Sequence, residues 1–583
     1  PPVDPEDVPQ ALARLADHSL LVVTPGPDGT CYRLLETVSQ YGGELLDEVG
    51  EHDAVHARHL AWCQSLAAAL ETGEGARAPA FEAVVDDLRA ALTWASGEPD
   101  RRAAAHELAL RLARLAFSHR LLRESQRRYE QAAALAGNDA EAAEALHLAA
   151  GAAAAGLWGN ETVRLYRAAA DAARRAGDRR RAALDLARTV ECAHRFPGIM
   201  HELLSQEELA TLLAEARVLA GGDPHVEAAI LTATATAPNI GDRDPLNAEL
   251  AERAVELARR VDDARLESGA LDQLEVSQLA VGDVLGAAAG AQRRVALLSP
   301  RWGDVDVAFE LSDALHMAAM TSIGVGDLAA GRDFARQRLD LPFHGEERHM
   351  AVDWLLVVAA LAGDLDEAVE LTRRFRAGWE RAGRPPWGGF AVTPAAAAMV
   401  FGLRGDDQAR EEWLGILAEM RRVVAPVMER IPRFGPTFEA LVALHRGELD
   451  AASAALAEDP GSVPHWHTGV WNQWYSALWA ETTVLAERPD RYDRLARARM
   501  ITARNPIAAA VVDRAEALAA GDRAGLVASA AAFEAAGCRY QRARTLVLAG
   551  GDERVEGEAA LAALGAAPMA LQADWLTRRI RRA

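Results

Sequence analysis

The chain has 583 residues, half of them hydrophobic, and its formal net charge at pH 7 is −22. A chain of this length forms either several globular domains or one long array of repeats, and its negative charge argues against a segment that grips nucleic acid. No apolar run approaches the roughly 18 residues that span a bilayer, and the first residues do not have the pattern of a signal peptide. We therefore expect a cytoplasmic protein with no membrane segment. Because the sequence does not begin with methionine, we also expect it to start inside a longer polypeptide.

Residues that could carry catalysis do not form a recognisable pattern. The four cysteines, Cys31, Cys63, Cys192 and Cys538, are scattered, which fits neither a disulfide framework nor a set of metal ligands. The sequence contains no lysine, so neither a Schiff-base lysine nor a P-loop lysine is present. We also find no nucleophile elbow, no paired-carboxylate site and no G-x-G-x-x-G motif after a strand. The sequence therefore predicts a binding protein without catalytic residues, metal or cofactor.

Residues 1–50 predict a small unit of mixed structure that differs from the rest of the chain. A turn rich in glycine and proline separates two short runs of strand-forming residues, and an apolar helical pattern lies on either side. Helix, hairpin, helix is the order of elements at the end of a winged-helix domain, with the hairpin as the wing. We predict a helix over 9–17, strands over 19–24 and 30–34 joined by a turn over 25–29, and a helix over 35–48 that stops at Gly50.

From about residue 52 onward, one turn signal recurs between amphipathic helices. Glycine readily adopts the left-handed conformation just past a helix end, and an acidic residue after it can accept the free N–H groups of the next helix. Asp364 and Glu367 have the spacing of a capping box. Between Gly282 and Gly447 the signal returns every 37 to 44 residues, which is the size of one tetratricopeptide or HEAT hairpin. The signal occurs at Gly177-Asp178, Gly282-Asp283, Gly326-Asp327, Gly363-Asp364, Gly405-Asp406, Gly447-Glu448 and Gly521-Asp522.

Three stretches interrupt this rhythm, and one of them is rich in tryptophan. Residues 384–389, 425–436 and 459–467 contain helix-breaking residues and predict loops, which is where a solenoid usually places specificity. Trp471, Trp474 and Trp479 fall near one helical face, so helix packing is the default interpretation of this cluster. The alternative is an aromatic-lined groove for a ligand or a peptide. The candidate residues of that groove are Trp466, which we place in the loop, His467, Trp471, Trp474 and Trp387.

Other charged or histidine-rich features have ordinary explanations. His52, His56 and His59 share a helical face, but no cysteine or carboxylate set completes a zinc site, so we expect a surface or capping role. The arginines of residues 578–582 suit the end of a helix and are too few to bind DNA or lipid against the overall charge. We expect the carboxylates to lie on solvated polar faces.

Six stretches of the chain carry a resemblance to a known class: 13–21 (ARLADHSLL), 32–41 (YRLLETVSQY), 56–62 (HARHLAW), 86–95 (DDLRAALTWA), 533–546 (FEAAGCRYQRARTL) and 564–569 (LGAAPM). They resemble the C-terminal part of large actinobacterial signal-transducing ATPases of the AfsR and LuxR types, also called STAND ATPases. The resemblance is specific over about residues 10–95 and 530–570, and between them it rests on the repeat rhythm. The chain departs from the class in three ways. The P-loop and the acidic ATPase strand are absent, LLE replaces the Met-His-Asp of related switches at residues 34–36, and WLTRRIRR at 575–582 is too short for a DNA-reading helix-turn-helix.

The resemblance implies both an architecture and a role. We predict an all-α protein, with a winged-helix remnant over 1–50, linking helices over 51–100 and a right-handed solenoid of tetratricopeptide-like hairpins over 101–583. The implied role is the sensor or interaction arm of a nucleotide-switched transcriptional or signalling regulator. Its partners would be an upstream nucleotide-binding domain of the same polypeptide and an effector or protein, with no direct contact to nucleic acid or membrane. Two alternatives remain open: a constitutive scaffold, and a helical-repeat enzyme with an aromatic-lined cavity.

Overall fold

A computed structural model of the chain describes most of its residues as helices. The described residues are 4, 6–26, 29–72, 78–200, 202–235, 245–341, 349–384, 391–421, 433–461 and 466–570. They form 28 α-helices and one two-stranded sheet, so the predicted all-α solenoid preceded by a small β-hairpin is confirmed. Within these ranges no helix is both long and apolar enough to cross a membrane. The handedness and the tetratricopeptide class remain predictions.

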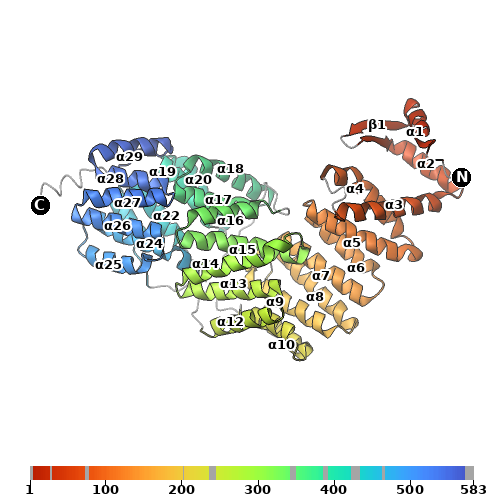
Figure 1. Cartoon of the computed structure of the whole chain (residues 1–583), viewed down its shortest axis with the longest axis horizontal. Coiled ribbons are helices and arrows are strands. Elements are labelled where there is room, and N and C mark those ends of the chain that lie inside the picture. Colours follow the sequence, from red (N-terminus) through yellow and green to blue (C-terminus); the bar gives the residue numbers. More distant parts are fainter. Residues whose placement is uncertain are drawn as a thin grey trace. The chain divides into compact units, whose positions relative to one another are not determined.

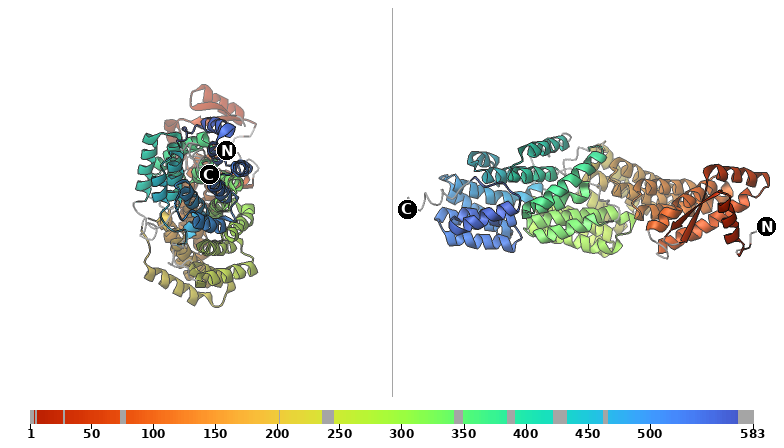
Figure 2. Two further views of the ribbon diagram at one scale, coloured as in Figure 1. Left: turned by 90° about the vertical axis from the view of Figure 1, so that its left-hand side faces the viewer. Right: turned by 90° about the horizontal axis from the view of Figure 1, so that it is seen from above.

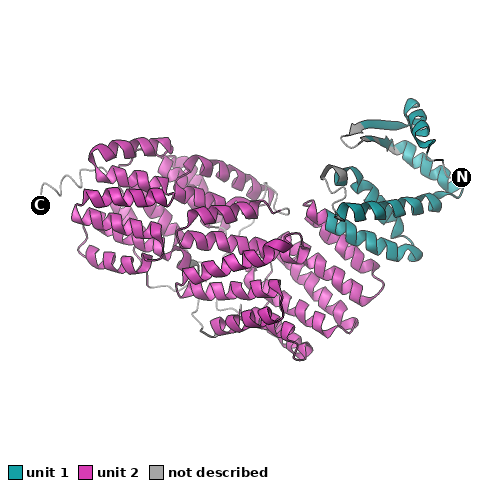
Figure 3. Ribbon diagram, in the orientation of Figure 1, with its two compact units in different colours: residues 1–115 teal, residues 116–583 magenta. Residues whose placement is uncertain are grey.

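The chain divides into two compact units, residues 1–115 and residues 116–583 (Figure 3). Each unit is described by itself below. The elements of the first unit are α1 (Val8–Asp17), β1 (Leu21–Gly26), β2 (Gly29–Leu34), α2 (Glu36–Glu48), α3 (His52–Thr72), α4 (Ala78–Ala95), the 3-10 turn η1 (Pro99–Arg101) and most of α5 (Arg102–Ser118).

The N-terminal hairpin has the predicted order but begins two residues later than predicted. Ser19 takes a left-handed conformation (φ 58°), and the N–H groups of Ser19 and Leu20 donate to the carbonyl oxygens of Ala16 and Leu15. These two bonds close the C-terminus of α1, so the strand starts only at Leu21. The strands are antiparallel, with Leu21 opposite Leu34, Val23 opposite Tyr32 and Gly26 opposite Gly29. Gly50, with φ 70°, ends the following helix as predicted.

The second unit is a succession of helices in which most helices pack against the next one along the chain (Figure 1). Figure 2 shows the same helices from two other directions. The α-helices are α6 (Leu122–Leu135), α7 (Asp139–Ala155), α8 (Gly159–Arg175), α9 (Arg179–Arg195), α10 (Gln206–Ala220), α11 (Pro224–Ala235), α12 (Pro245–Arg260), α13 (Ala264–Ala280), α14 (Val284–Leu298), α15 (Val305–Gly324), α16 (Leu328–Leu339), α17 (His349–Ala362), α18 (Leu365–Arg381), α19 (Val392–Arg404), α20 (Asp407–Met420), α22 (Phe434–His445), α23 (Leu449–Ala455), α24 (Trp466–Leu485), α25 (Arg491–Thr502), α26 (Pro506–Ala520), α27 (Arg523–Ala535), α28 (Arg539–Ala549) and α29 (Gly551–Ala563). Two 3-10 turns, η2 (Pro197–Ile199) and η3 (Ser299–Arg301), follow α9 and α14.

The repeated glycine–acid turns separate these helices as predicted. Each of the seven glycines has a positive φ, between 71° and 87°, and each acidic residue directly precedes a helix. The carboxylates of Asp178, Asp283, Asp327 and Asp406 accept an N–H from the first turn of the helix that follows. The capping box predicted at Asp364 is wrong, because its side chain makes no cap bond. Arg332 and Arg539 bind that carboxylate instead.

The predicted loops are only partly described. Residues 385–390, 422–432 and 462–465 lie outside the described residues. Two of the loops are shorter than predicted, because α22 begins at Phe434 and α24 begins at Trp466. Pro436 therefore lies in the first turn of α22, where a missing N–H costs no helical hydrogen bond. Trp466, placed in a loop from the sequence, is the first residue of a helix.

One helix of each successive pair in the second unit also packs against its equivalents along the array. These inner helices are α7, α9, α11, α13, α15, α17, α19, α22, α24, α26 and α28. Inner helices that are far apart in sequence also touch: α7 packs on α15, α24 packs on α13 and α15, and α28 packs on α17. A Cβ on Gly151 of α7 would lie 3.2 Å from Cγ1 of Val305 in α15. The inner helices are therefore covered from several sides, and every residue of α17 is buried.

Candidate functional site

Two tryptophans of the candidate groove, Trp471 and Trp474, lie in the interior rather than along an open surface. Trp471 and Trp474 of α24 are 2% and 4% exposed. Trp466 and His467 are the first two residues of the same helix, but their side chains lie outside what the structure describes, and so does all of Trp387. The structure therefore brings together Trp471 and Trp474 on one helix and leaves the rest of the candidate groove undescribed.

The buried tryptophans hold α24 against its neighbours. The Trp471 ring packs edge-on against Phe438 of α22, with ring centroids 5.3 Å apart. The Trp474 indole N–H donates to the carbonyl oxygen of Ile323 in α15 over 3.0 Å. Trp479 lies beneath the guanidinium groups of Arg494 and Arg497. These are contacts of helix packing, which is the default interpretation of the tryptophan cluster.

The N-terminal unit, in contrast, exposes apolar side chains over a whole segment. Among the side chains that the structure describes, none before Leu60 is buried. Residues 8–49 nevertheless include eleven large hydrophobic side chains that are exposed, and we call this region the hairpin segment. A two-stranded hairpin without a packing partner is marginally stable in water, and contiguous exposed apolar patches usually mark interaction sites. The eleven are Val8, Leu15, Leu20, Val22, Val23, Tyr32, Leu34, Leu35, Tyr41, Leu45 and Val49.

The strand register sorts the hairpin side chains onto two different faces. Residues opposite one another in an antiparallel pair share a face, and successive residues alternate. Val23 with Tyr32 and Leu21 with Leu34 therefore form one apolar face. Val22 lies on the opposite face, across from Arg33. The hairpin is thus amphipathic, with four apolar side chains on the first face and none of them buried.

Both helices of the hairpin segment extend the apolar surface. No residue of α1 is buried, although its apolar residues gather on one side. In α2, Tyr41 and Leu45 are four residues apart, so they lie on one helical face, and both are exposed. The hairpin segment therefore carries exposed apolar side chains on two strands and two helices, and it is the candidate docking site of this chain.

Charged side chains are buried between the inner helices, which contradicts the expectation that all carboxylates are solvated. Arg294 of α14 is fully buried and donates to Asp272 and Glu275 of α13 (2.6 and 3.2 Å) and to Glu310 and Asp313 of α15 (3.0 and 2.5 Å). Arg195 of α9 adds bonds to three of the same carboxylates, those of Asp272, Glu310 and Asp313. Burial raises the pKa of Glu275 well above its usual value, against the opposing effect of Arg294. The sequence carries no local signal for this cluster, because α9, α13 and α15 each contain several charged residues and nothing in the pattern separates the buried ones from the others.

A second buried polar cluster links α7, α9 and α15. His147 Nδ1 lies 2.6 Å from Asp185 Oδ1, and its Nε2 lies 3.1 Å from Asp306 Oδ1. Arg188 also binds Asp306 and approaches His147 Nε2 at 3.2 Å. Burial alone would lower the pKa of His147, but the two carboxylates outweigh burial and raise it. The network around His147 and the cluster around Arg294 together form a polar interior between helices α7–α15. The chain's own side chains occupy this interior.

The remaining sequence features take part in local contacts. In the first unit, the His56 ring stacks on Trp94 with centroids 5.4 Å apart, and His59 Nε2 lies 3.5 Å from Asp87. The described residues contain no group of three or more His, Cys, Asp or Glu side chains arranged to hold a metal. Burial raises the pKa of Cys63 and Cys192 to about 12, so neither thiol is activated. The arginines of 578–582 lie outside the described residues.

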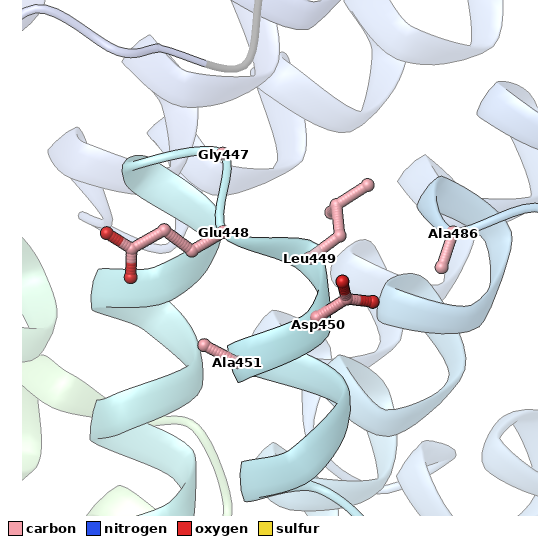
Figure 4. A pocket seen from close by; sticks show the side chains of 6 residues that line it. All are labelled: Gly447, Glu448, Leu449, Asp450, Ala451 and Ala486. Atoms are coloured by element: carbon pink, nitrogen blue, oxygen red, sulfur yellow. The ribbon is translucent and has the colours of Figure 1, made fainter.

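A pocket opens at the surface where the turn between α22 and α23 approaches the end of α24 (Figure 4). Its lining contains two carboxylates, Glu448 and Asp450, which point in different directions in Figure 4. No basic or nucleophilic side chain lines it, so it contains no acid–base pair or nucleophile. The lining residues are Gly447, Glu448, Leu449, Asp450, Ala451 and Ala486.

Comparison with known proteins gives a partial similarity to regulators. No protein-family model matches the chain. It is 41% identical over 129 residues to proteins of Mycobacterium tuberculosis and Mycobacterium bovis that are each named "Putative HTH-type transcriptional regulator". The match covers 21% of this chain and only 14% of the length of each relative. Over about a fifth of its length, the chain is thus similar to proteins that are named as transcriptional regulators and are much longer than the matched stretch.

Proposed function

We propose that this chain is the helical interaction arm of a nucleotide-switched transcriptional regulator, and that its hairpin segment docks on a nucleotide-binding domain earlier in the same polypeptide. The observation that carries the proposal is the exposed apolar surface of residues 8–49, in which no described side chain is buried. The similarity to mycobacterial proteins named as transcriptional regulators supports the regulatory role. The resemblance to the STAND class supports the nucleotide-binding occupant.

In this arrangement the second unit receives an effector or a protein partner. Binding would change the output only if the partner prefers one of two states of the regulator. The polar interior between helices α7–α15 is occupied by the chain's own ion pairs and hydrogen bonds. The partner would therefore bind the outward surfaces or the loops of the solenoid. The chain itself would act without a cofactor, without catalysis and without direct contact to nucleic acid or membrane, in the cytoplasm.

Two neighbouring valines provide a matched test of the docking surface. Val22 and Val23 are 44% and 43% exposed but lie on opposite faces of the hairpin. Each valine is replaced by Asp in the longer polypeptide that is encoded when the reading frame is extended upstream of Pro1. Limited proteolysis then reports whether residues 8–49 are protected from cleavage. Val23→Asp should make the hairpin segment cleavable, and Val22→Asp should leave it protected. Equal protection in both variants would rule out docking through the Val23 face.

The same polypeptide separates this role from a constitutive scaffold. An upstream domain whose nucleotide state alters protection of residues 8–49 supports the switch. An upstream region with no nucleotide-binding domain supports the scaffold and contradicts the proposal.

A further inference from the structure

Three glycine–acid turns of the second unit are each covered by a later segment of the chain. At Gly326, Gly363 and Gly405 an added Cβ would touch a residue far along the sequence. The covering residues follow one another in the same order as the turns that they cover. Successive stretches of the C-terminal half thus lie on successive turns of earlier repeats. The pairs are Gly326 with Asn505, Gly363 with Tyr540 and Gly405 with Ala567.

Arginines of the covering segments also pair with the acidic residues of such turns. Arg539, which directly precedes Tyr540, places its Nη1 3.0 Å from Asp364 Oδ1. Arg504 places its Nη1 3.6 Å from Asp283 Oδ1. A covering segment therefore brings positive charge to a turn that carries negative charge.

The last described segment of the chain, residues 564–570, leads from one turn toward the next, and we call it the strap. The N–H of Ala567 donates to the carbonyl oxygen of Leu403 over 2.8 Å, and the N–H of Ala570 donates to that of His445 over 3.1 Å. These carbonyls lie in the last turns of α19 and α22, where a helix leaves its own carbonyl groups without partners. The strap thus runs from the end of α19 to the end of α22, and α22 leads directly into the next glycine–acid turn.

That next turn, Gly447-Glu448, has carboxylates that are not engaged. Glu448 and Asp450 are exposed, and within the described part of the chain neither forms an ion pair or a side-chain hydrogen bond. The neighbouring carboxylate of Asp407, in contrast, is paired with Arg446. Glu448 and Asp450 line the pocket of Figure 4, which has a volume of about 610 Å³, so a further side chain has room beside them.

The sequence that follows the strap is rich in positive charge. Residues 571–583, which we call the tail, lie outside the described residues. The tail contains four arginines, all within 578–582, and a single acidic residue, Asp574. Arg578 is eight positions beyond Ala570, and eight residues of extended chain span up to about 28 Å. Because Ala570 is already bound at the end of α22, the arginines of the tail can reach the turn that follows this helix.

We propose that the arginines of residues 578–582 bind the carboxylates of Glu448 and Asp450, so that the tail covers the Gly447-Glu448 turn as earlier segments cover earlier turns. Ion pairs between exposed side chains are individually weak. The tail is held beside the turn by the strap, however, so its effective concentration there is high and weak pairs suffice. The contact does not depend on the role proposed for the hairpin segment.

The absence of lysine makes this contact measurable by cross-linking. A carbodiimide joins an amine directly to a carboxylate that lies against it, and the wild-type chain has no side-chain amine. In four single variants of the full chain, Arg578→Lys, Arg579→Lys, Arg581→Lys and Arg582→Lys, the tail carries one. Mass spectrometry should show a link from at least one of these positions to Glu448 or Asp450. Adding Glu448→Gln and Asp450→Asn to the same variant should abolish it.

Arg373→Lys is the matched positive control, because Arg373 forms an exposed ion pair with Glu370 on α18. The reaction should link position 373 to Glu370. If this control reacts while all four tail positions link only to other carboxylates, or to none, the proposal is overturned. A link that joins two different chains, seen when ¹⁴N- and ¹⁵N-labelled proteins are mixed, would also overturn it.

Discussion

Gly469 of α24 lies directly against the carbonyl oxygen of Leu279 in α13, although 190 positions separate them in the sequence. A Cβ at Gly469 would overlap that oxygen and its carbonyl carbon. The close approach explains why α24, which carries the buried tryptophans, can pack on an inner helix from a much earlier repeat.

This approach predicts that Gly469→Ala destabilises the chain by about 1–3 kcal/mol, because overpacking displaces a helix backbone. Gly415→Ala is the matched control, since nothing lies within 4 Å of a Cβ there and alanine favours a helix interior by up to about 1 kcal/mol. The measurement is the midpoint of urea unfolding. Equal midpoints for the two variants would show that α24 does not pack this closely on α13.

Local features of the fold were predictable from the sequence, but contacts between distant repeats were not. Glycine conformations and hairpin turns depend on a few neighbouring residues, so the glycine–acid turns and the order of elements in residues 8–48 were predicted correctly. The packing of α24 on α13 depends on how the whole array curves, which no local pattern encodes. The buried carboxylates were missed for the same reason: Glu481 looks like any helical glutamate until Arg514 and Arg544 are brought to it.

The Arg294 cluster predicts opposite effects for two glutamates. Burial raises the pKa of Glu275 well above its usual value, so the folded state disfavours the ionised carboxylate and Glu275→Gln should not lower the free energy of unfolding at pH 7. Arg195 and Arg294 outweigh burial and lower the pKa of Glu310, so Glu310 is ionised. Glu310→Gln should cost about 3–5 kcal/mol, because it breaks a buried ion pair from one side. Urea unfolding at pH 7 measures the free energy of unfolding of both variants. A marked loss of stability in Glu275→Gln would contradict the raised pKa of Glu275.

Glu275 also gives a pH dependence with a definite sign. A carboxyl whose pKa is raised by folding favours the folded state at low pH, and this stability is lost as the pH rises above the ordinary glutamate value of about 4.3. The stability advantage of Glu275→Gln over the wild type should therefore grow between pH 5 and pH 7.

His147 should stabilise the contact between α7 and α15 more strongly at low pH. Its pKa is raised in the folded state, so its contribution is complete below about pH 6.5 and is lost as the pH rises through the folded value. Removing the His147 imidazole leaves the carboxylates of Asp185 and Asp306 with one hydrogen-bond partner fewer. This loss should lower the free energy of unfolding by about 1–3 kcal/mol. The difference in free energy of unfolding between wild type and His147→Gln should be larger at pH 6 than at pH 9. His18→Gln, at an exposed position, serves as the control.

The chain alone should neither bind nor hydrolyse ATP. A P-loop holds the triphosphate with a glycine-rich loop and its lysine, and this sequence has no lysine. Isothermal titration calorimetry with ATP and ADP should give no binding heat. Micromolar binding would mean that the chain contains a nucleotide site of another kind.

Hydrogen exchange of the hairpin segment tests the central claim most directly. In the chain that begins at Pro1, the amides of β1 and β2 should exchange rapidly, because none of the side chains of the segment that the structure describes is buried. In the polypeptide extended upstream, the same amides should exchange much more slowly, because the apolar face of Val23, Tyr32 and Leu34 is then covered. Identical exchange of residues 8–49 in the two proteins would contradict the proposal that this segment docks on an upstream domain.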